Sequence, residues 1–145
     1  MKILTKYFGE VNIDPDTTLH FKDGVFGFED EKEFAFLQFS EEDSFLLSLQ
    51  SVKTPYLAFT LVNPFMLIPD YKPVLNDDEL EQMQVQKSEE LCFYNMCRIK
   101  KPVSDSTINL RCPIVINDTT RQAKQVILDD YEMRFPLSSL EKRDK

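Results

Sequence analysis

The sequence predicts a mainly β protein, a small antiparallel β-barrel-like domain with one short helix near residues 76–84. Short runs of aromatic and branched residues, which are typical of strands, follow one another with turn residues between them. Several of these runs are apolar on both faces, which favours a closed or strongly curled sheet over an open sheet with one solvated face. The third observation is a segment that begins with the capping residues of a helix.

The predicted strands extend from near the N-terminus almost to the C-terminal tail. In chain order they are KILTKY (2–7), TLHF (18–21), FAFLQF (34–39), FLLSLQS (45–51), YLAFTLV (56–62), LCFYNMCRI (91–99), TINLRC (107–112), IVIN (114–117) and KQVIL (124–128). In TLHF, strand alternation turns His20 away from the side shared by Leu19 and Phe21.

The stretch STINLRCPIVIN is predicted to be scaffold rather than a site of chemistry. Alternation places Ile108, Leu110 and Cys112 on one face of a strand. Pro113 then marks a bend or a strand edge before the second apolar run, because proline cannot donate to a sheet ladder.

The predicted helix begins in LNDDELEQM. Asn76 can cap it, Glu79 completes a capping box three residues later, and Leu75 and Leu80 occupy the positions of a hydrophobic staple. Acidic residues in the first turn suit the positive end of the helix, so Asp77, Asp78 and Glu79 have a structural explanation.

Before the helix, the segment NPFMLIPDYKP contains three prolines, which argue against a long central strand there. Two interpretations of its apolar residues stay open. Phe65 to Tyr71 could form a partly exposed patch that binds a partner, or they could be loop residues that cover the core.

Length and composition favour one domain that folds without disulfides. A chain of 145 residues with 42% hydrophobic residues can build its own core. The three cysteines, Cys92, Cys97 and Cys112, lie in apolar runs without a C-x-x-C spacing, which indicates a reducing cytoplasm. The N-terminus does not have the pattern of a signal peptide, and no run of about 18 apolar residues predicts a membrane span.

The negative charge is concentrated in the first half of the chain. Residues 1–80 carry 15 acidic and 6 basic residues, a net charge of −9, whereas residues 81–145 carry 10 and 11, a net charge of +1. Acidic clusters at 29–33, 41–43 and 77–79 would repel a phosphate backbone, so we expect no direct binding of nucleic acid. The alternative reading of each cluster is a solvated face.

Motifs that carry chemistry are sparse. His20 is the single histidine, and zinc sites need three or four protein ligands. The three glycines form no phosphate-binding or nucleophile-elbow motif. We therefore expect no catalytic residue, no metal site and no cofactor. A glycosidase-like pair of carboxylates stays open, because such a pair is defined by separation in space.

Several segments resemble, in order, the motifs of the flagellar assembly factor family FliW. They are KYFGEVNID (6–14), HFKDGVFGFEDEKEF (20–34), FLLSLQS (45–51), INLRCPIVIN (108–117), KQVIL (124–128) and YEMRFPL (131–137). The sequence departs from the family pattern at Phe26, where proline is common, and at Cys112, where a small residue usually precedes the proline. Either departure could alter a turn or a packing detail.

The resemblance implies a single domain over residues 1–137, followed by a polar tail at 138–145. It implies a non-enzymatic, cytoplasmic regulator with a small β-barrel-like fold, which binds flagellin and antagonises the translational repressor CsrA noncompetitively. The candidate partner-binding residues are Glu41, Glu42, Asp43, Phe65, Tyr71, Asp77, Asp78 and Glu79. Two alternatives stay open: an acidic mimic of nucleic acid that occupies a basic RNA-binding groove, and a small carboxylate-based hydrolase.

Overall fold

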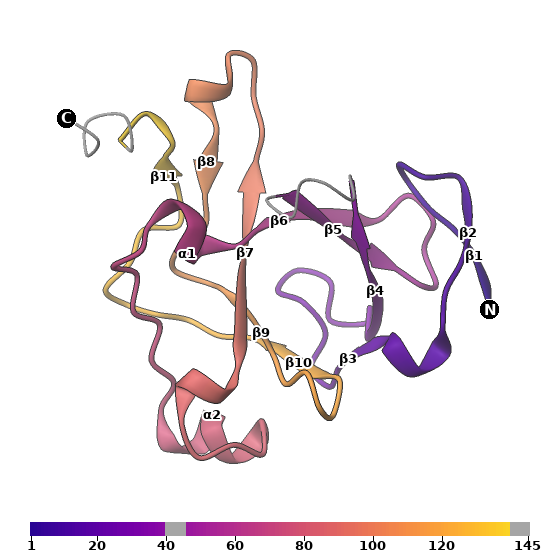
Figure 1. Ribbon diagram of the computed structural model, residues 1–145, viewed down its shortest axis with the longest axis horizontal. Helices are drawn as coiled ribbons and strands as arrows, with labels where there is room; N and C mark the ends of the chain where they lie inside the picture. The colour runs from indigo at the N-terminus through magenta and orange to yellow at the C-terminus, as the bar shows by residue number, and fades with distance from the viewer. Residues whose placement is uncertain (40–45, 140–145) are drawn as a thin grey trace.

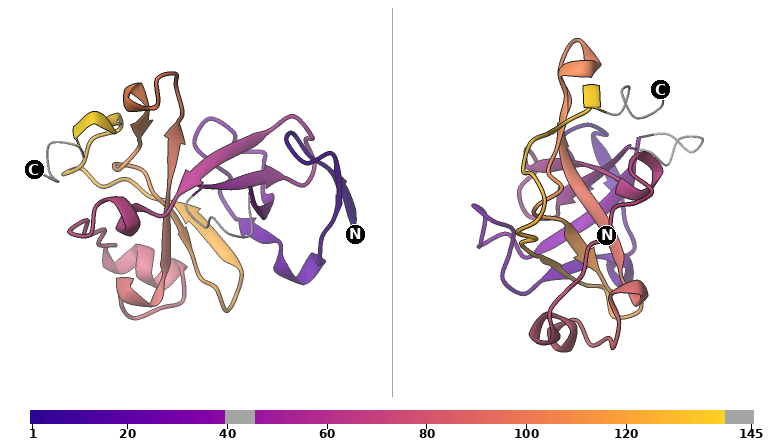
Figure 2. Two further views of the ribbon diagram at one scale, coloured as in Figure 1. Left: turned by 45° about the horizontal axis from the view of Figure 1, so that its top comes forward. Right: turned by 90° about the vertical axis from the view of Figure 1, so that its left-hand side faces the viewer.

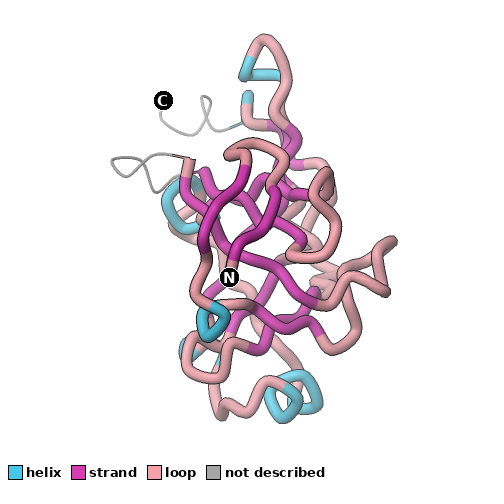
Figure 3. The backbone as a smooth tube through the Cα atoms, turned by 90° about the vertical axis from the view of Figure 1, so that its right-hand side faces the viewer, coloured by secondary structure: helices cyan, strands magenta, loops and turns pink. Residues whose placement is uncertain are grey.

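The computed structural model describes residues 1–39 and 46–139. The strands are β1 (Lys2–Leu4), β2 (Glu10–Asn12), β3 (Leu19–Phe21), β4 (Glu33–Gln38), β5 (Leu46–Ser51), β6 (Ala58–Val62), β7 (Cys92–Arg98), β8 (Thr107–Ile108), β9 (Ile114–Ile116), β10 (Gln122–Gln125) and β11 (Phe135–Pro136). The helices are α1 (Pro64–Leu67) and α2 (Asp77–Gln82), with 3-10 turns η1 (Pro15–Thr17), η2 (Ser88–Glu90) and η3 (Val103–Asp105). Strands dominate and the helices lie at the periphery (Figure 3).

Seven strands close into a barrel in the order β3, β4, β5, β6, β7, β9 and β10 (Figure 1). The ring closes where β7 pairs with β9, at Cys92 opposite Ile116, and where β10 pairs with β3, at Gln122 opposite His20. The predicted mainly β barrel is therefore confirmed. One detail of the prediction is wrong, because β10 and β3 are parallel. An odd number of strands cannot alternate in direction around a closed ring, so at least one neighbouring pair must be parallel.

Two hydrophobic cores share the barrel wall. The barrel core contains buried residues from all of its strands except β7, which contributes partly buried Tyr94 and Met96. The outer core lies between the wall and the segments that cover it, and includes Tyr71, Ile108 and Leu110. On β9, Ile114 and Ile116 belong to the barrel core and Val115 to the outer core. This explains why the strand is apolar on both faces, since neither face meets water.

The predicted helix is present as α2, and its capping box is confirmed. The Asn76 Oδ1 atom accepts a hydrogen bond from the Glu79 N–H at 2.8 Å, and the Glu79 Oε1 atom accepts one from the Asn76 N–H at 3.0 Å. Helix α1 was not predicted. Its first residue is Pro64 and its cap is Asn63, whose side chain accepts from the Phe65 N–H at 3.0 Å. Proline here begins a helix as well as ending a strand, because the first helical N–H needs no partner within the helix.

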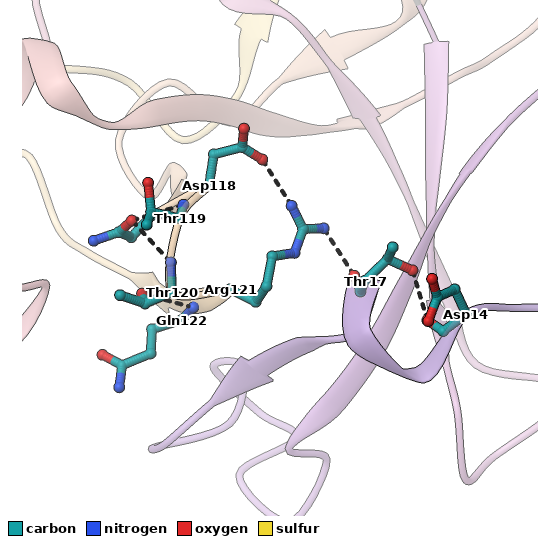
Figure 4. A network of polar contacts seen from close by, with 8 residues as sticks. Asp14, Thr17, Asp118, Thr119, Thr120, Arg121 and Gln122 are labelled. Atoms are coloured by element: carbon teal, nitrogen blue, oxygen red, sulfur yellow. Dashed lines mark hydrogen bonds and ion pairs between the residues drawn. The ribbon is translucent and has the colours of Figure 1, made fainter.

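Arg121 connects the turn between β9 and β10 to the 3-10 turn η1, just before β3 (Figure 4). Its Nη1 atom donates to Asp118 Oδ1 at 2.7 Å, and its Nη2 atom donates to the Thr17 carbonyl at 2.8 Å. The Asn117 Oδ1 atom accepts from two N–H groups within the same turn. These bonds hold the turn beside the parallel pair of strands that closes the barrel.

Gln125 connects Phe26 and Cys112, the two positions singled out from the sequence as departures from the resembled family. Its Oε1 atom accepts from the Phe26 N–H at 2.9 Å, and its Nε2 atom donates to the Cys112 carbonyl at 3.2 Å. A proline at residue 26 would have no N–H to offer Gln125. The hydrogen bond from the Phe26 N–H is therefore one that a proline at this position could not form.

Two hairpins extend beyond the barrel. The β1–β2 hairpin is held to it by the Lys6 N–H, which donates to Gln50 Oε1 at 2.9 Å. Strands β7 and β8 continue away from the barrel, with β11 paired to β8 (Figures 1 and 2). Within residues 1–39 and 46–139, no helix is long and apolar enough to cross a membrane.

Candidate partner-binding surface

Most of the predicted site residues lie in one excursion of the chain, residues 63–91, between β6 and β7. This excursion carries α1 and α2 on the same side of the molecule as the segment that leads to β11 (Figure 1). Phe65, Tyr71 and the cluster 77–79 belong to it. The other predicted cluster, Glu41, Glu42 and Asp43, lies outside the described residues.

Tyr71 is buried, with 3% of its surface exposed. Its hydroxyl donates to the Leu110 carbonyl at 2.6 Å and accepts from Asn95 Nδ2 at 3.3 Å. Its ring meets the ring of Tyr131 edge to face, with the centroids 4.7 Å apart. Burial raises the pKa of Tyr71 to about 12, since the charged phenolate would lose its hydration. The side chain positions the excursion and presents almost no surface to a partner.

Phe65 and Met66 are the exposed apolar residues of the same segment, at 40% and 55% of their surface. The Phe65 ring nevertheless packs on Tyr71 at 6.0 Å and on Phe93 at 6.3 Å between centroids. One side of Phe65 is therefore fixed by the outer core, while the other side is open to solvent. A rigid aromatic group with an open face is suited to packing against an apolar partner residue.

An acidic pocket of about 260 Å³ opens beside Tyr71. It is lined by Ile68, Asp70, Tyr71, Leu110, Asp130, Tyr131, Glu132 and Phe135. Tyr131 connects the two walls of the pocket, because the Tyr131 hydroxyl accepts a hydrogen bond from the Lys72 N–H at 3.0 Å. Three carboxylate side chains around aromatic walls would favour a partner segment that carries both positive and apolar groups.

Sequence reasoning missed the second wall of this pocket, residues 130–135. These residues meet Tyr71 only through the tertiary fold, about sixty positions along the chain. The available indication was the motif YEMRFPL, which supported the family resemblance but was given no role at a site.

The acidic cluster of α2 contains the exposed Asp77 and Asp78 and the partly exposed Glu79. Glu79 is engaged in the capping box, whereas Asp77 and Asp78 project from the first turn. The two aspartates are therefore the members of this cluster that remain free to influence a partner through charge.

The described residues bring no familiar catalytic constellation together. His20 is exposed, and its neighbours on β3 are buried, as alternation predicts. The pKa values of two of the described carboxylates, Glu31 and Glu90, are lowered. Burial acts to raise the pKa of Glu31, but hydrogen bonds from Ser51 and Thr54 outweigh it. The N–H groups of Lys87 and Gln86 lower the pKa of Glu90. A general acid needs a raised pKa instead.

A solved crystal structure has the same fold as this chain. A crystal structure of the flagellar assembly factor FliW superposes with a TM-score of 0.87 at 39% sequence identity, covering 94% of this chain and 96% of that one. The closed barrel and its covered wall therefore define a protein of the flagellar assembly factor class.

Sequence relatives give the same result over almost the whole chain. The family described as FliW protein matches residues 2–137. A flagellar assembly factor FliW from Geobacillus sp. (strain WCH70) is 43% identical over 88% of each chain, and one from Exiguobacterium sp. is 38% identical over 94% of each. The chain belongs to the FliW family.

Proposed function

We propose that this protein is a non-enzymatic regulator that binds flagellin in the cytoplasm. Once flagellin has been exported, the freed protein binds CsrA and weakens its hold on messenger RNA without occupying the RNA site. Membership of the FliW family is the observation that carries this proposal. No cofactor is needed, because the function consists of exchanging one protein partner for another.

Flagellin is proposed to dock through an amphipathic helical segment from one of its ends, which are unpacked before filament assembly. Phe65 and Met66 would contact the apolar face of that helix. Tyr71 would act indirectly, because it supports the Phe65 ring from within the core. Asp130 and Glu132 would form ion pairs with positive groups at the edge of the helix.

CsrA is proposed to bind beside its basic RNA-binding surface, facing the acidic clusters 41–43 and 77–79. Nearby negative charge would lower the potential felt by incoming RNA within roughly one Debye length, about 8–10 Å at ordinary salt. Such an effect weakens RNA binding without covering the site. In the alternative, an acidic mimic would occupy the RNA groove itself.

Co-purification of the full chain with flagellin and with CsrA tests the choice of partners. We expect both complexes, with flagellin displacing CsrA. The double change Phe65→Ala and Met66→Ala should weaken flagellin binding at least about tenfold. Val74→Ala is the matched control, since Val74 is 69% exposed and does not line the acidic pocket. If neither partner is retained, the proposal is wrong; if flagellin affinity stays within about twofold, the docking segment is wrong.

A further inference from the structure

We propose that a second, basic groove binds an acidic protein segment that carries apolar side chains. The groove lies where β7 leaves the barrel. The segment leading to β11 separates it from the acidic pocket, since residues 130–132 line the pocket and Met133 and Arg134 line the groove. It has a volume of about 380 Å³ and is lined by Phe59, Met96, Cys97, Arg98, Lys100, Thr107, Asn109, Met133 and Arg134. This interaction is additional to the proposed binding of flagellin and CsrA at the acidic surfaces.

Strand register places the groove residues in rows on one face of the β7–β8–β11 sheet. Arg98 lies opposite Thr107 on β8, so Met96, two residues earlier, lies opposite Asn109. The Asn109 N–H accordingly donates to the Met96 carbonyl at 2.8 Å. Strand β11 pairs with β8 in a register that places Arg134 opposite Asn109. Arg134 therefore extends the row formed by Met96 and Asn109. Met96, Arg98 and Arg134 therefore share one face.

The opposite face of this small sheet is already occupied. Ile108 is fully buried in the outer core, and Phe135 packs against that core. Only the face with the cations is left for a partner.

The groove opens because the barrel sheet splits at this point. Strand β6 pairs with β7 only at Leu61 and Val62, while its earlier residues pair with β5 alone. Phe59, on the half of β6 that does not pair with β7, forms the far wall of the groove. Met96 and Arg98 on β7 and Thr107 on β8 line the near wall. These two strands project from the barrel as a hairpin (Figure 2).

The positive charge of the groove indicates which kind of segment it binds. Arg98, Lys100 and Arg134 are exposed, and within the described part of the chain they form no ion pair. The groove thus brings three positive charges together on a protein whose net charge is −8. Carboxylates pair with arginine in a bidentate manner, so an acidic segment satisfies these cations.

The groove floor favours a protein segment over RNA. Met96, Met133 and Phe59 supply the apolar contacts, and Met133 is 57% exposed. Methionine adapts to differently shaped apolar side chains, as it does at other peptide-binding surfaces. A nucleic acid would extend past three cations onto an acidic protein, where its phosphates would be repelled.

The test uses the full chain and a fluorescent peptide of about 15 residues with Glu and Leu on opposite helix faces. Its controls are the same peptide with Glu replaced by Gln, and single-stranded RNA of equal length. We expect the acidic peptide to bind at least about tenfold more tightly than either control. In methyl NMR spectra, Met96 and Met133 should shift, whereas Met83, 2% exposed and outside this groove, should not.

Charge reversal provides the second measurement. The double change Arg98→Glu and Arg134→Glu should weaken peptide binding at least about tenfold. Lys53→Glu with Lys87→Glu changes the net charge equally at exposed positions outside the groove, and should alter affinity less than about twofold. The proposal is wrong if the acidic peptide does not bind, or if the Gln peptide or the RNA binds equally well. It is also wrong if the protein self-associates and the Arg98 and Arg134 reversals abolish this, because the occupant would then be a second copy of the chain.

Discussion

The hydroxyl of Tyr71 donates a 2.6 Å hydrogen bond to the carbonyl of Leu110, and this bond joins the excursion to the segment between β8 and β9. Both residues are buried, and Asn95 donates to the same hydroxyl. One side chain thus satisfies two polar groups of the outer core and supports the exposed Phe65 ring. The stability of the excursion and the shape of the proposed flagellin surface should therefore change together.

Replacing Tyr71 by Phe should lower the free energy of unfolding by about 1–3 kcal/mol, since the buried Leu110 carbonyl and Asn95 amide each lose a partner. Urea denaturation of the variant measures this loss. Tyr56→Phe is the control, because Tyr56 is 77% exposed and should change stability by less than about 0.5 kcal/mol. Equal effects of the two changes would show that the Tyr71 hydrogen bonds contribute nothing.

Stability should also fall at alkaline pH through Tyr71. Its pKa is about 12 in the folded protein against 10.0 for the ordinary group, because burial disfavours the phenolate. The resulting stability is complete below pH 10 and is lost as pH rises towards about 12, since only the unfolded chain releases the proton in that range.

The slope from one such group is at most about 1.4 kcal/mol per pH unit. Urea denaturation at about pH 8 and about pH 11 should show a smaller decrease for Tyr71→Phe than for the unmodified chain. Identical decreases would mean that Tyr71 titrates normally in the folded state.

Gly24 should be less replaceable than Gly27, although both have positive φ angles, +70° and +85°. A Cβ atom at Gly24 would clash with the Glu29 carbonyl oxygen, whereas one at Gly27 would meet nothing within 4 Å. Gly27→Ala should therefore cost about 1–2 kcal/mol for its backbone conformation alone. Gly24→Ala should cost at least about 1 kcal/mol more, because backbone must move. Thermal and urea denaturation measure the loss of stability in each variant. Equal losses for Gly24→Ala and Gly27→Ala would contradict this prediction.

The three thiols should react with an alkylating reagent at different rates. Cys92 is exposed, although partial burial of its thiol and the nearby Asp118 raise its pKa. Burial raises the pKa of Cys97 to about 12, and Cys112 is buried. Because the thiolate is the reactive form, mass spectrometry should find Cys92 modified first and Cys97 only on unfolding. Modification of Cys97 before Cys92 in the folded protein would be inconsistent with this barrel.

Local patterns were sufficient for most strands, for α2 and for its capping box, because period-two burial and caps depend on neighbouring residues. Strands β2 and β11 were not predicted, and the prediction of a strand over 107–112 is wrong beyond Ile108, where β8 ends. Local patterns also indicated a closed sheet, since Ile114, Val115 and Ile116 were apolar without alternation. The parallel pairing of β3 with β10 could not be predicted in this way, because it depends on the ring as a whole.

The site was harder to predict for the same reason. Phe65 and Met66 are exposed within the candidate segment, but Tyr71 is buried by a ring sixty positions away, Tyr131. The basic groove is assembled from β6, β7, β8 and the segment before β11, and none of these runs suggests a site by itself. The uneven charge was visible in the sequence, but its placement on one face of a sheet required the strand register.

The central claim concerns how repression is relieved, and an RNA titration of CsrA at several fixed concentrations of this protein tests it most directly. We expect the maximal amount of RNA–CsrA complex to decrease as the protein concentration rises, even at saturating RNA, because the protein binds beside the RNA site. If saturating RNA restores complex formation in full at every protein concentration, the inhibition is competitive, and the protein acts instead as an acidic mimic within the RNA groove.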